Sequence, residues 1–185
     1  MPVLTVFAGP NGSGKSSIIR RGEFEGKLNL LEADAIAKRM NPALPEQAAI
    51  SAGREVLLRA KRYLLGGENF SIETTLAGAW TSAVVRSALE SGFFVRLIYV
   101  CVDSAERSIQ RVRERVARGG HDVPDRDIRR RYVRSLVNAR RVLRVVHEAL
   151  VFDNTGEKPE LVLELREGHV ISRAETLRNW VLGIL

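Results

Sequence analysis

The sequence predicts an α/β fold, a three-layer α/β/α sandwich built on a mainly parallel sheet of about five strands. Two observations predict it. Short apolar runs of strand length alternate along the chain with segments of helical period, as in a parallel sheet with helical crossovers. The run "FFVRLIYVCV" at 93–102 is apolar on both sides, which suits a strand in the middle of such a sheet. The chain has 185 residues and no linker or internal repeat, so we expect a single domain over residues 1–185.

The first elements follow one another closely. The apolar run "PVLTVFA" at 2–8 has the length of a buried strand, and a glycine-rich loop separates it from "KSSIIRR", which indicates a helix starting at Lys15. A second, weaker strand is expected at 28–34, "LNLLEAD". The chain is therefore expected to begin as strand, loop, helix and strand.

A long helix is expected at 45–67, because Pro45 suits a first helical position and glycines follow the last apolar residues. The apolar face of this helix is expected to contain Ile50, Leu57, Ala60 and Leu64. A strand at 69–75 and a helix at 80–92 follow. These elements repeat the alternation of helix and strand.

The strand at 93–102 leads into a basic helix expected at 103–120. Asp103 and Glu106 have the spacing of a capping box at its start, and two glycines follow its end. The sequence therefore predicts Asp103 as the residue that caps this helix.

The last third of the chain is expected to hold a second basic helix at about 127–147 and a short strand at 149–154. The tail, at about 160–185, indicates a small β-hairpin that turns at Glu167 and Gly168, followed by a short helix. The predicted fold is therefore a parallel core with a small hairpin appended.

Composition excludes several classes of protein. A single cysteine, Cys101, excludes an intramolecular disulfide and favours a reducing compartment. No stretch approaches the ~18 apolar residues of a membrane helix, and the first residues lack the basic flank and cleavage site of a secretory signal. We therefore expect a cytoplasmic protein that does not bind membranes.

Most of the positive charge lies in residues 104–144, which we call the arginine belt. This segment contains thirteen arginines, no lysine and five acids, so its formal charge is +8, whereas the whole chain carries +7. A guanidinium group binds phosphate oxygens in bidentate fashion, so the belt could bind nucleic acid or the polyphosphate of a small ligand. Only Tyr132 within it could stack on a base, which makes nucleic acid the less favoured partner.

The loop after the first strand matches the phosphate-binding pattern G-x-x-x-x-G-K-[ST] without a mismatch. Glycines let the backbone turn its amides toward an anion, and the following helix adds its positive end. Lys15 is expected to reach the β and γ phosphates of ATP as a catalytic residue, and Ser16 to ligate Mg²⁺. The alternative is a glycine turn that matches by coincidence. The expected nucleotide-binding residues are Gly9, Pro10, Asn11, Gly12, Ser13, Gly14, Lys15, Ser16 and Ser17.

Other features separate the classes of P-loop protein. A GTPase would carry an Asn-Lys-x-Asp signature, which is absent. A motor ATPase would have an apolar strand ending in an Asp that binds Mg²⁺, and the nearest match ends in Asp103, which the helix cap explains better. A small phosphotransferase remains, and it needs a base near the acceptor hydroxyl and cations around the γ-phosphate.

The candidates for these roles end predicted strands, because ligands of an open α/β sheet gather at the carboxyl ends of its strands. Asp34, Glu73 and Asp153 are acids at such ends. Asp34 is the expected catalytic base, and an N-cap of the next helix is the alternative. Glu73, with the adjacent Thr74, is expected to bind substrate, since a carboxylate on an apolar strand needs a substrate hydroxyl or a metal-bound water. A salt bridge to an arginine is the alternative for Glu73.

A mobile lid is expected at about 118–131, where glycines adjoin a basic helix end. Its closure would bring guanidinium groups over the phosphates, where they neutralise charge in the transition state. Arg118 and Arg131 are the expected catalytic pair, and most other arginines of the belt are expected on solvated helix faces. His121 is expected to have a positional role.

Four motifs, in this order, resemble the zeta toxin family of P-loop kinases in its short bacterial branch: "AGPNGSGKSS", "EADAIAKRMNP", "FSIETTLAG" and "RVARGGHDVPDRDIRRRYVRSL". The resemblance covers roughly residues 3–155. It implies a P-loop NTPase fold of nucleotide-kinase type and transfer of the γ-phosphate of ATP to the 3′-hydroxyl of the sugar in UDP-N-acetylglucosamine, with Mg²⁺. It also implies a separate antitoxin protein as a partner.

By motif, the resemblance carries the family's functional residues to Lys15, Ser16, Asp34, Glu73, Arg118 and Arg131, in the roles given above. It also places Asp153 and Asn154 in a loop near the adenine. Two alternatives stay open at this point. One is a kinase for another acceptor, such as a nucleoside, a polynucleotide end or an antibiotic. The other is a nucleotide-dependent binding module without catalysis.

Overall fold

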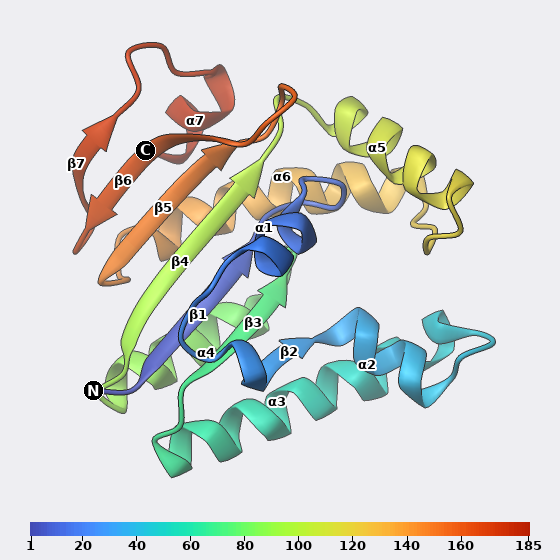
Figure 1. Cartoon of the computed structure of the whole chain (residues 1–185), viewed down its shortest axis with the longest axis horizontal. Coiled ribbons are helices and arrows are strands. Elements are labelled where there is room, and N and C mark those ends of the chain that lie inside the picture. Colours follow the sequence, from blue (N-terminus) through green and yellow to red (C-terminus); the bar gives the residue numbers. More distant parts are fainter.

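The computed structural model describes every residue from Met1 to Leu185 and has a seven-stranded sheet at its centre (Figure 1). The strand order is β2-β3-β1-β4-β5-β6-β7. The first five strands of this order are parallel, and β6 and β7 extend the same sheet in antiparallel pairing. The predicted three-layer α/β fold with a mainly parallel sheet is confirmed, and the hairpin joins this sheet as its sixth and seventh strands.

The strands are β1 (Val3–Ala8), β2 (Leu30–Glu32), β3 (Phe70–Thr74), β4 (Phe94–Cys101), β5 (Glu148–Asp153), β6 (Glu160–Arg166) and β7 (His169–Arg173). The helices are α1 (Lys15–Arg21), α2 (Ala33–Met40), α3 (Ala49–Gly66), α4 (Ala79–Glu90), α5 (Ala105–Ala117), α6 (Asp125–Val142) and α7 (Asn179–Ile184). Two short 3₁₀ helices lie at Lys27–Asn29 and Pro45–Ala48. None of the helices is both long and apolar enough to cross a membrane.

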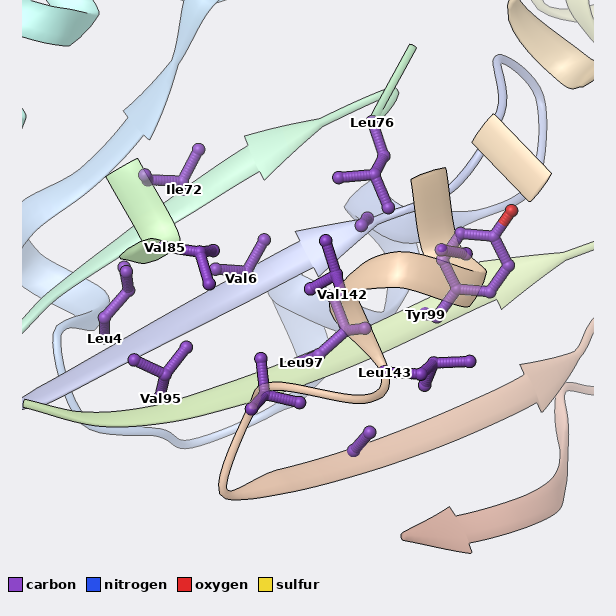
Figure 2. Close-up of a cluster of buried hydrophobic side chains, with 14 of the residues drawn as sticks. Leu4, Val6, Ile72, Leu76, Val85, Val95, Leu97, Tyr99, Val142 and Leu143 are labelled. Atoms are coloured by element: carbon purple, nitrogen blue, oxygen red, sulfur yellow. The ribbon is translucent and has the colours of Figure 1, made fainter. Parts of the chain in front are cut away.

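The strand β1 is the middle one of the five parallel strands. Its side chains lie in two layers, because successive residues of a strand point to opposite faces. Leu4 and Val6 lie in the main core with Val85 of α4 and Val142 of α6 (Figure 2). Phe7 is also buried, and α1 lies in front of the sheet while α4 and α6 lie behind it (Figure 1). Helices on both faces leave the carboxyl ends of the parallel strands as the place where loops gather.

The buried face of α3 differs from the prediction. Its buried residues are Ala52, Val56 and Ala60. Ile50 is 75% exposed and Leu57 is 41% exposed, whereas Leu64 packs against the core as expected. The helix docks on the sheet through a face that includes Tyr63, which stacks on Phe70 of β3 at 5.4 Å between ring centroids, and Ile50 and Leu57 lie outside that face. Apolar residues occur on both sides of this helix, so the sequence pattern alone did not select the correct face.

The cap of α5 is displaced by one residue from the prediction. Ser104 is the N-cap, and its hydroxyl oxygen accepts a hydrogen bond from the backbone N–H of Arg107 at 3.2 Å. Asp103 instead forms an ion pair with the Arg107 side chain, with 2.8 Å between Nε and Oδ1. This pairing lowers the pKa of Asp103. The prediction of Asp103 as the cap was therefore wrong, because a serine next to it supplies the capping oxygen.

The hairpin turns where the sequence predicted. Glu167 and Gly168 have φ angles of 48° and 77°, so both central residues lie in the left-handed region that a two-residue hairpin turn requires. Glycine adopts this conformation without steric cost, which explains the turn at this point.

Candidate active site

A cleft of about 920 Å³ opens at the carboxyl ends of the parallel strands. Four segments form it: the glycine loop with α1, the junction of β2 and α2, the end of β3, and the helices α5 and α6 with the loop between them. Its charged and titratable side chains are Lys15, Arg20, Glu32, Asp34, Glu73, Arg111, Arg115, Arg118, His121, Arg130, Arg131 and Arg134. The cleft therefore has one acidic wall and one wall rich in arginine.

The glycine loop, residues 9–14, turns tightly from β1 into α1. A Cβ atom at Gly9 would lie 1.9 Å from the carbonyl oxygen of Val100, so no larger residue fits there. The backbone N–H of Ser13 donates to the Pro10 carbonyl at 3.3 Å, and Gly14, at φ 99°, is the N-cap of α1. The backbone of this loop is thus held in the conformation that its glycines permit.

Lys15 lies at the bottom of the cleft and is buried. Its Nζ donates to the carbonyl oxygens of Gly9 and Pro10, at 2.9 Å and 3.0 Å, and lies 3.9 Å from Oε1 of Glu73. Burial lowers the pKa of Lys15, and the charges of Glu73 and Asp34 partly oppose this effect. The ammonium group is therefore held between the glycine loop and the acidic wall.

The acidic wall consists of Glu32, Asp34 and Glu73. The Ser16 hydroxyl donates to Glu73, with 3.2 Å between Oγ and Oε1. Glu32 is the register partner of Glu73 on the neighbouring strand. Burial, a hydrogen bond with Glu73 and the charges of Glu73 and Asp34 raise the pKa of Glu32 to about 7. The Glu32 carboxyl group is therefore partly protonated near neutral pH.

Asp34 occupies a different position from the one expected. The strand β2 has only three residues and ends at Glu32, so Asp34 lies in the first turn of α2. It is not the N-cap either, because Glu32 holds that position. Asp34 nevertheless lines the cleft, which brings it together with Glu73 and Lys15 as the sequence predicted.

Thr74 lines the cleft, but its hydroxyl has partners within the protein. Its Oγ1 lies 3.0 Å from Oγ1 of Thr81 and accepts a hydrogen bond from the backbone N–H of Leu76 at 3.0 Å. The side chain of Thr74 therefore holds the loop after β3 in place. It lines the cleft, but its hydroxyl group already has hydrogen-bond partners within the protein.

Arg118 and Arg131 both line the cleft, from α5 and α6 respectively. Arg118 Nε donates to the Glu114 carbonyl at 3.1 Å, and Arg131 has no hydrogen-bond or ion-pair partner among the side chains. Sequence reasoning missed five further cleft arginines: Arg20, Arg111, Arg115, Arg130 and Arg134. Arg20 lies on α1, and the other four lie on α5 and α6, where their spacing of four residues could have shown which arginines share one helix face.

The loop between α5 and α6 contains the glycines of the expected lid. Gly119 has a φ of 83°, and its N–H donates to the Val116 carbonyl at 2.8 Å, which ends α5. Val123, later in the loop, packs in a small apolar cluster with Ile109, Val112 and Ile128. The loop thus begins with two glycines, Gly119 and Gly120, and its later part is held in place by the burial of Val123.

Asp153 ends β5 as predicted but does not line the cleft, because it is only 6% exposed. Its carboxylate accepts hydrogen bonds from Thr155 and Arg178. A second cavity, of about 370 Å³, lies between α5 and the loop that follows Asp153. Arg111 lines both this cavity and the cleft, so the two spaces are neighbours.

Comparison with known proteins agrees with this geometry. Residues 4–152 match the model of AAA_33, described as an AAA domain. The chain belongs to the AAA_33 family. An uncharacterised protein of Haemophilus influenzae (strain ATCC 51907 / DSM 11121 / KW20 / Rd) is 32% identical to this AAA_33 chain over 126 residues, which cover 68% of this chain and 89% of that protein.

Solved structures share the fold of this AAA_33 chain. The AvrRxo1-ORF1:-ORF2 complex with ATP has a TM-score of 0.66 at 17% identity, covering 92% of this chain and 60% of that chain. A structure of the PezAT chromosomal toxin-antitoxin system of Streptococcus pneumoniae has a TM-score of 0.64 at 18% identity, covering 89% of this chain and 72% of that one. The chain thus spans about 60% of the length of the first of these relatives. The shared fold is a P-loop NTPase fold of the kinase-like type.

Proposed function

We propose that this protein is an ATP-dependent kinase of the zeta-toxin type, which transfers the γ-phosphoryl group of ATP to a sugar hydroxyl, the 3′-hydroxyl of UDP-N-acetylglucosamine. One observation carries the proposal: the cleft brings together the glycine loop with Lys15, the carboxylates of Asp34 and Glu73, and several arginines. These are the parts that phosphoryl transfer requires, namely a phosphate cradle, a base for the acceptor and cations for the developing charge.

The glycine loop fits a magnesium–nucleotide complex. Oδ1 of Asn11 and Oγ of Ser13 are buried in this loop without a hydrogen-bond partner, and buried polar atoms normally have one. Mg²⁺ prefers oxygen ligands, and Ser16 offers a hydroxyl oxygen beside the Glu73 carboxylate. Ser16 would hold the metal, with Glu73 oriented toward a metal-bound water or a substrate hydroxyl. Bound there, Mg²⁺ would neutralise charge on the phosphates.

The chain's own residues divide the reaction between them. The Asp34 carboxylate accepts the proton of the acceptor hydroxyl while the acceptor oxygen bonds to the γ-phosphorus and the bond from that phosphorus to the leaving ADP oxygen breaks. Lys15 holds the phosphates, and Arg118 and Arg131 stabilise the charge that develops during transfer. The free guanidinium of Arg131 supports this role, since no internal ion pair has to break first.

The two walls of the cleft also suit the proposed acceptor. Carboxylates accept hydrogen bonds from the hydroxyl groups of a sugar, and arginines bind the oxygens of a diphosphate. Tyr132, the one aromatic residue of the arginine belt, is buried, and its hydroxyl donates to the Val102 carbonyl at 2.8 Å. It is therefore not free to stack on a base, which favours a small acceptor over a polynucleotide.

The test is to incubate the protein with ATP, Mg²⁺ and UDP-N-acetylglucosamine and to look by mass spectrometry for a product heavier by one phosphoryl group. We expect this product from the wild-type protein and from Lys27→Ala, a half-buried lysine outside the cleft that is paired with Glu23, but not from Lys15→Ala. Product from Lys15→Ala at the wild-type rate would refute the assigned site. Transfer to a nucleoside, a 5′-hydroxyl oligonucleotide or an antibiotic instead would refute the acceptor and keep the kinase.

We further propose that a separate antitoxin protein inhibits this kinase. The structural similarity to the PezAT toxin-antitoxin system supports this proposal. Expression of the chain alone in a bacterial host is expected to slow growth, and Lys15→Ala is expected to remove the effect. Equal growth with the wild-type and variant chains would contradict it.

A further inference from the structure

The carboxyl-terminal segment, residues 153–185, lies outside the AAA_33 match and contacts the glycine loop. Asn154 makes this contact: its side-chain Nδ2 donates to the carbonyl oxygen of Ser13 at 2.8 Å. A Cβ atom on Gly14 would lie 2.2 Å from the same Nδ2, so the amide packs directly on the residue that precedes Lys15. Asn154 therefore supports the point where the glycine loop becomes α1.

Asn154 is itself held in place on both sides. Its backbone N–H donates to the carbonyl of Cys101, at the end of β4, at 2.8 Å. Its neighbour Asp153 is buried, and the two carboxylate oxygens of Asp153 accept from Thr155 and from Nε of Arg178. A buried carboxylate requires partners of this kind, so the bond from Arg178 fixes Asp153 and with it the start of the loop.

The position of Arg178 follows from the packing of α7, which begins immediately after it. The buried residues of this helix are Trp180, Val181 and Ile184. Trp180 lies against Tyr99 of β4, with 6.2 Å between the ring centroids. The packing of the last helix is thus connected, through Arg178 and Asp153, to Asn154 and the glycine loop.

The same loop also meets the arginine wall of the cleft. Nη2 of Arg111 donates to the carbonyl of Gly156 at 3.3 Å and lies 3.5 Å from the carbonyl oxygen of Thr155. Residues 153–156 are therefore held by the end of β4, by Arg178 and by Arg111 of α5. Through Asn154 they in turn contact the glycine loop.

From these contacts we infer that Asn154 and Arg178 are positioning residues for nucleotide binding, which keep the glycine loop in its binding conformation through Ser13 and Asp153. Neither side chain lines the cleft, so both act through other residues. Their role depends on the ATP binding proposed above. The carboxyl-terminal segment is accordingly a functional part of the nucleotide site.

The test measures the Kd of a non-hydrolysable ATP analogue with Mg²⁺ by calorimetry, and the melting temperature of each variant without nucleotide. Asn154→Ala is expected to raise the Kd about tenfold, the effect of losing one well-placed hydrogen bond. Asn29→Ala is the matched control, since its Nδ2 donates to the Asn69 carbonyl at 2.8 Å at the opposite end of the sheet. It is expected to lower the melting temperature by a similar amount and to leave the Kd unchanged.

A double-mutant cycle tests whether Arg178 acts through Asn154. Arg178→Ala is expected to raise the Kd in the wild-type background and to have much less effect when Asn154→Ala is already present, because coupled residues are not additive. Arg178→Lys should restore part of the affinity, and Arg173→Ala, on the exposed strand β7, should change nothing.

Wild-type affinity in Asn154→Ala, or additive losses in the cycle, would overturn the positioning role while the kinase proposal stands. Absence of binding by the wild-type protein would overturn the proposed function and the positioning role together.

Discussion

At the scale of single residues, the surroundings of the three carboxylates in the acidic wall divide their roles. Glu32 has a pKa raised to about 7 beside Glu73, and Glu73 accepts a hydrogen bond from Ser16. Asp34 has no hydrogen-bond or ion-pair partner in the structure and lines the cleft. A carboxylate without a partner can accept a proton from an incoming hydroxyl, so Asp34 is the best candidate for the base.

Asp34→Asn is expected to lower kcat about 100-fold or more, the usual contribution of a general base. The Kd for the ATP analogue should stay within about twofold, since the base acts on the acceptor. Steady-state kinetics and calorimetry measure the two quantities. Glu46→Gln, an exposed acid in the first turn of a neighbouring 3₁₀ helix, is the control. Equal kcat values for Asp34→Asn and the wild type would exclude Asp34 as the base.

Glu32→Gln tests the raised pKa of Glu32 through the pH dependence of stability. The pKa of Glu32 is raised in the folded state from 4.5 to about 7. Its stabilising contribution is therefore complete below about pH 4.5 and is lost as the pH rises through 7, where the folded protein must hold the charged form. We expect Glu32→Gln to melt a few degrees above the wild type at pH 8 and at the same temperature near pH 4.5. A difference that stays constant over this range would show that the pKa of Glu32 is not raised in the folded protein.

At the scale of elements, the orientation of each helix determines which of its residues are buried and which line the cleft. The fully buried residues of α3 are Ala52, Val56 and Ala60, whereas Ile50 and Leu57 point outward. On α5 and α6, the orientation of each helix likewise determines which arginines line the cleft. Arginines three or four positions apart share one face, and that face borders the cleft.

Two substitutions on α3 compare its faces. Val56→Ala is expected to lower the free energy of unfolding by about 2 kcal/mol, because it leaves a cavity in the core. Ile50→Ala, although it removes a larger side chain, is expected to change it by less than about 0.5 kcal/mol, because Ile50 is exposed. Urea unfolding measures both. A larger loss for Ile50→Ala would mean that the face predicted from sequence is the buried one.

At the scale of the whole molecule, the cleft is formed by segments that are far apart in the chain. The glycine loop, the acidic wall and the arginine belt meet there because the parallel strands all end at one edge of the sheet. A ligand that contacts several of these segments in the folded state alone must stabilise the whole fold.

The ATP analogue with Mg²⁺, at about 100 times its Kd, is therefore expected to raise the free energy of unfolding by about 2.7 kcal/mol. This corresponds to a rise of about 5–10 °C in the melting temperature for a chain of this size. Differential scanning fluorimetry measures the shift. Lys15→Ala is expected to show little of it. An equal shift in that variant would mean that the nucleotide binds elsewhere.

Some of the candidate site could be read from local sequence. The glycine loop needs its residues in one order over a short stretch, because the backbone itself forms the cradle. The alternation of apolar runs and helical segments likewise predicted the sheet and its helices. Both depend on interactions between residues that are neighbours in the chain, so pattern and spacing are enough to predict them.

The sequence by itself determined the α/β fold, the glycine loop at residues 9–14 and the hairpin turn at Glu167 and Gly168. Only the tertiary structure decided that Glu32 pairs with Glu73, which face of α3 is buried, and that Asn154 supports the glycine loop from 141 positions along the chain. These features depend on strand register and on the docking of distant segments. The hydrophobic pattern of one strand restricts its register, but it does not identify the partner strand or the distant segment that docks against it.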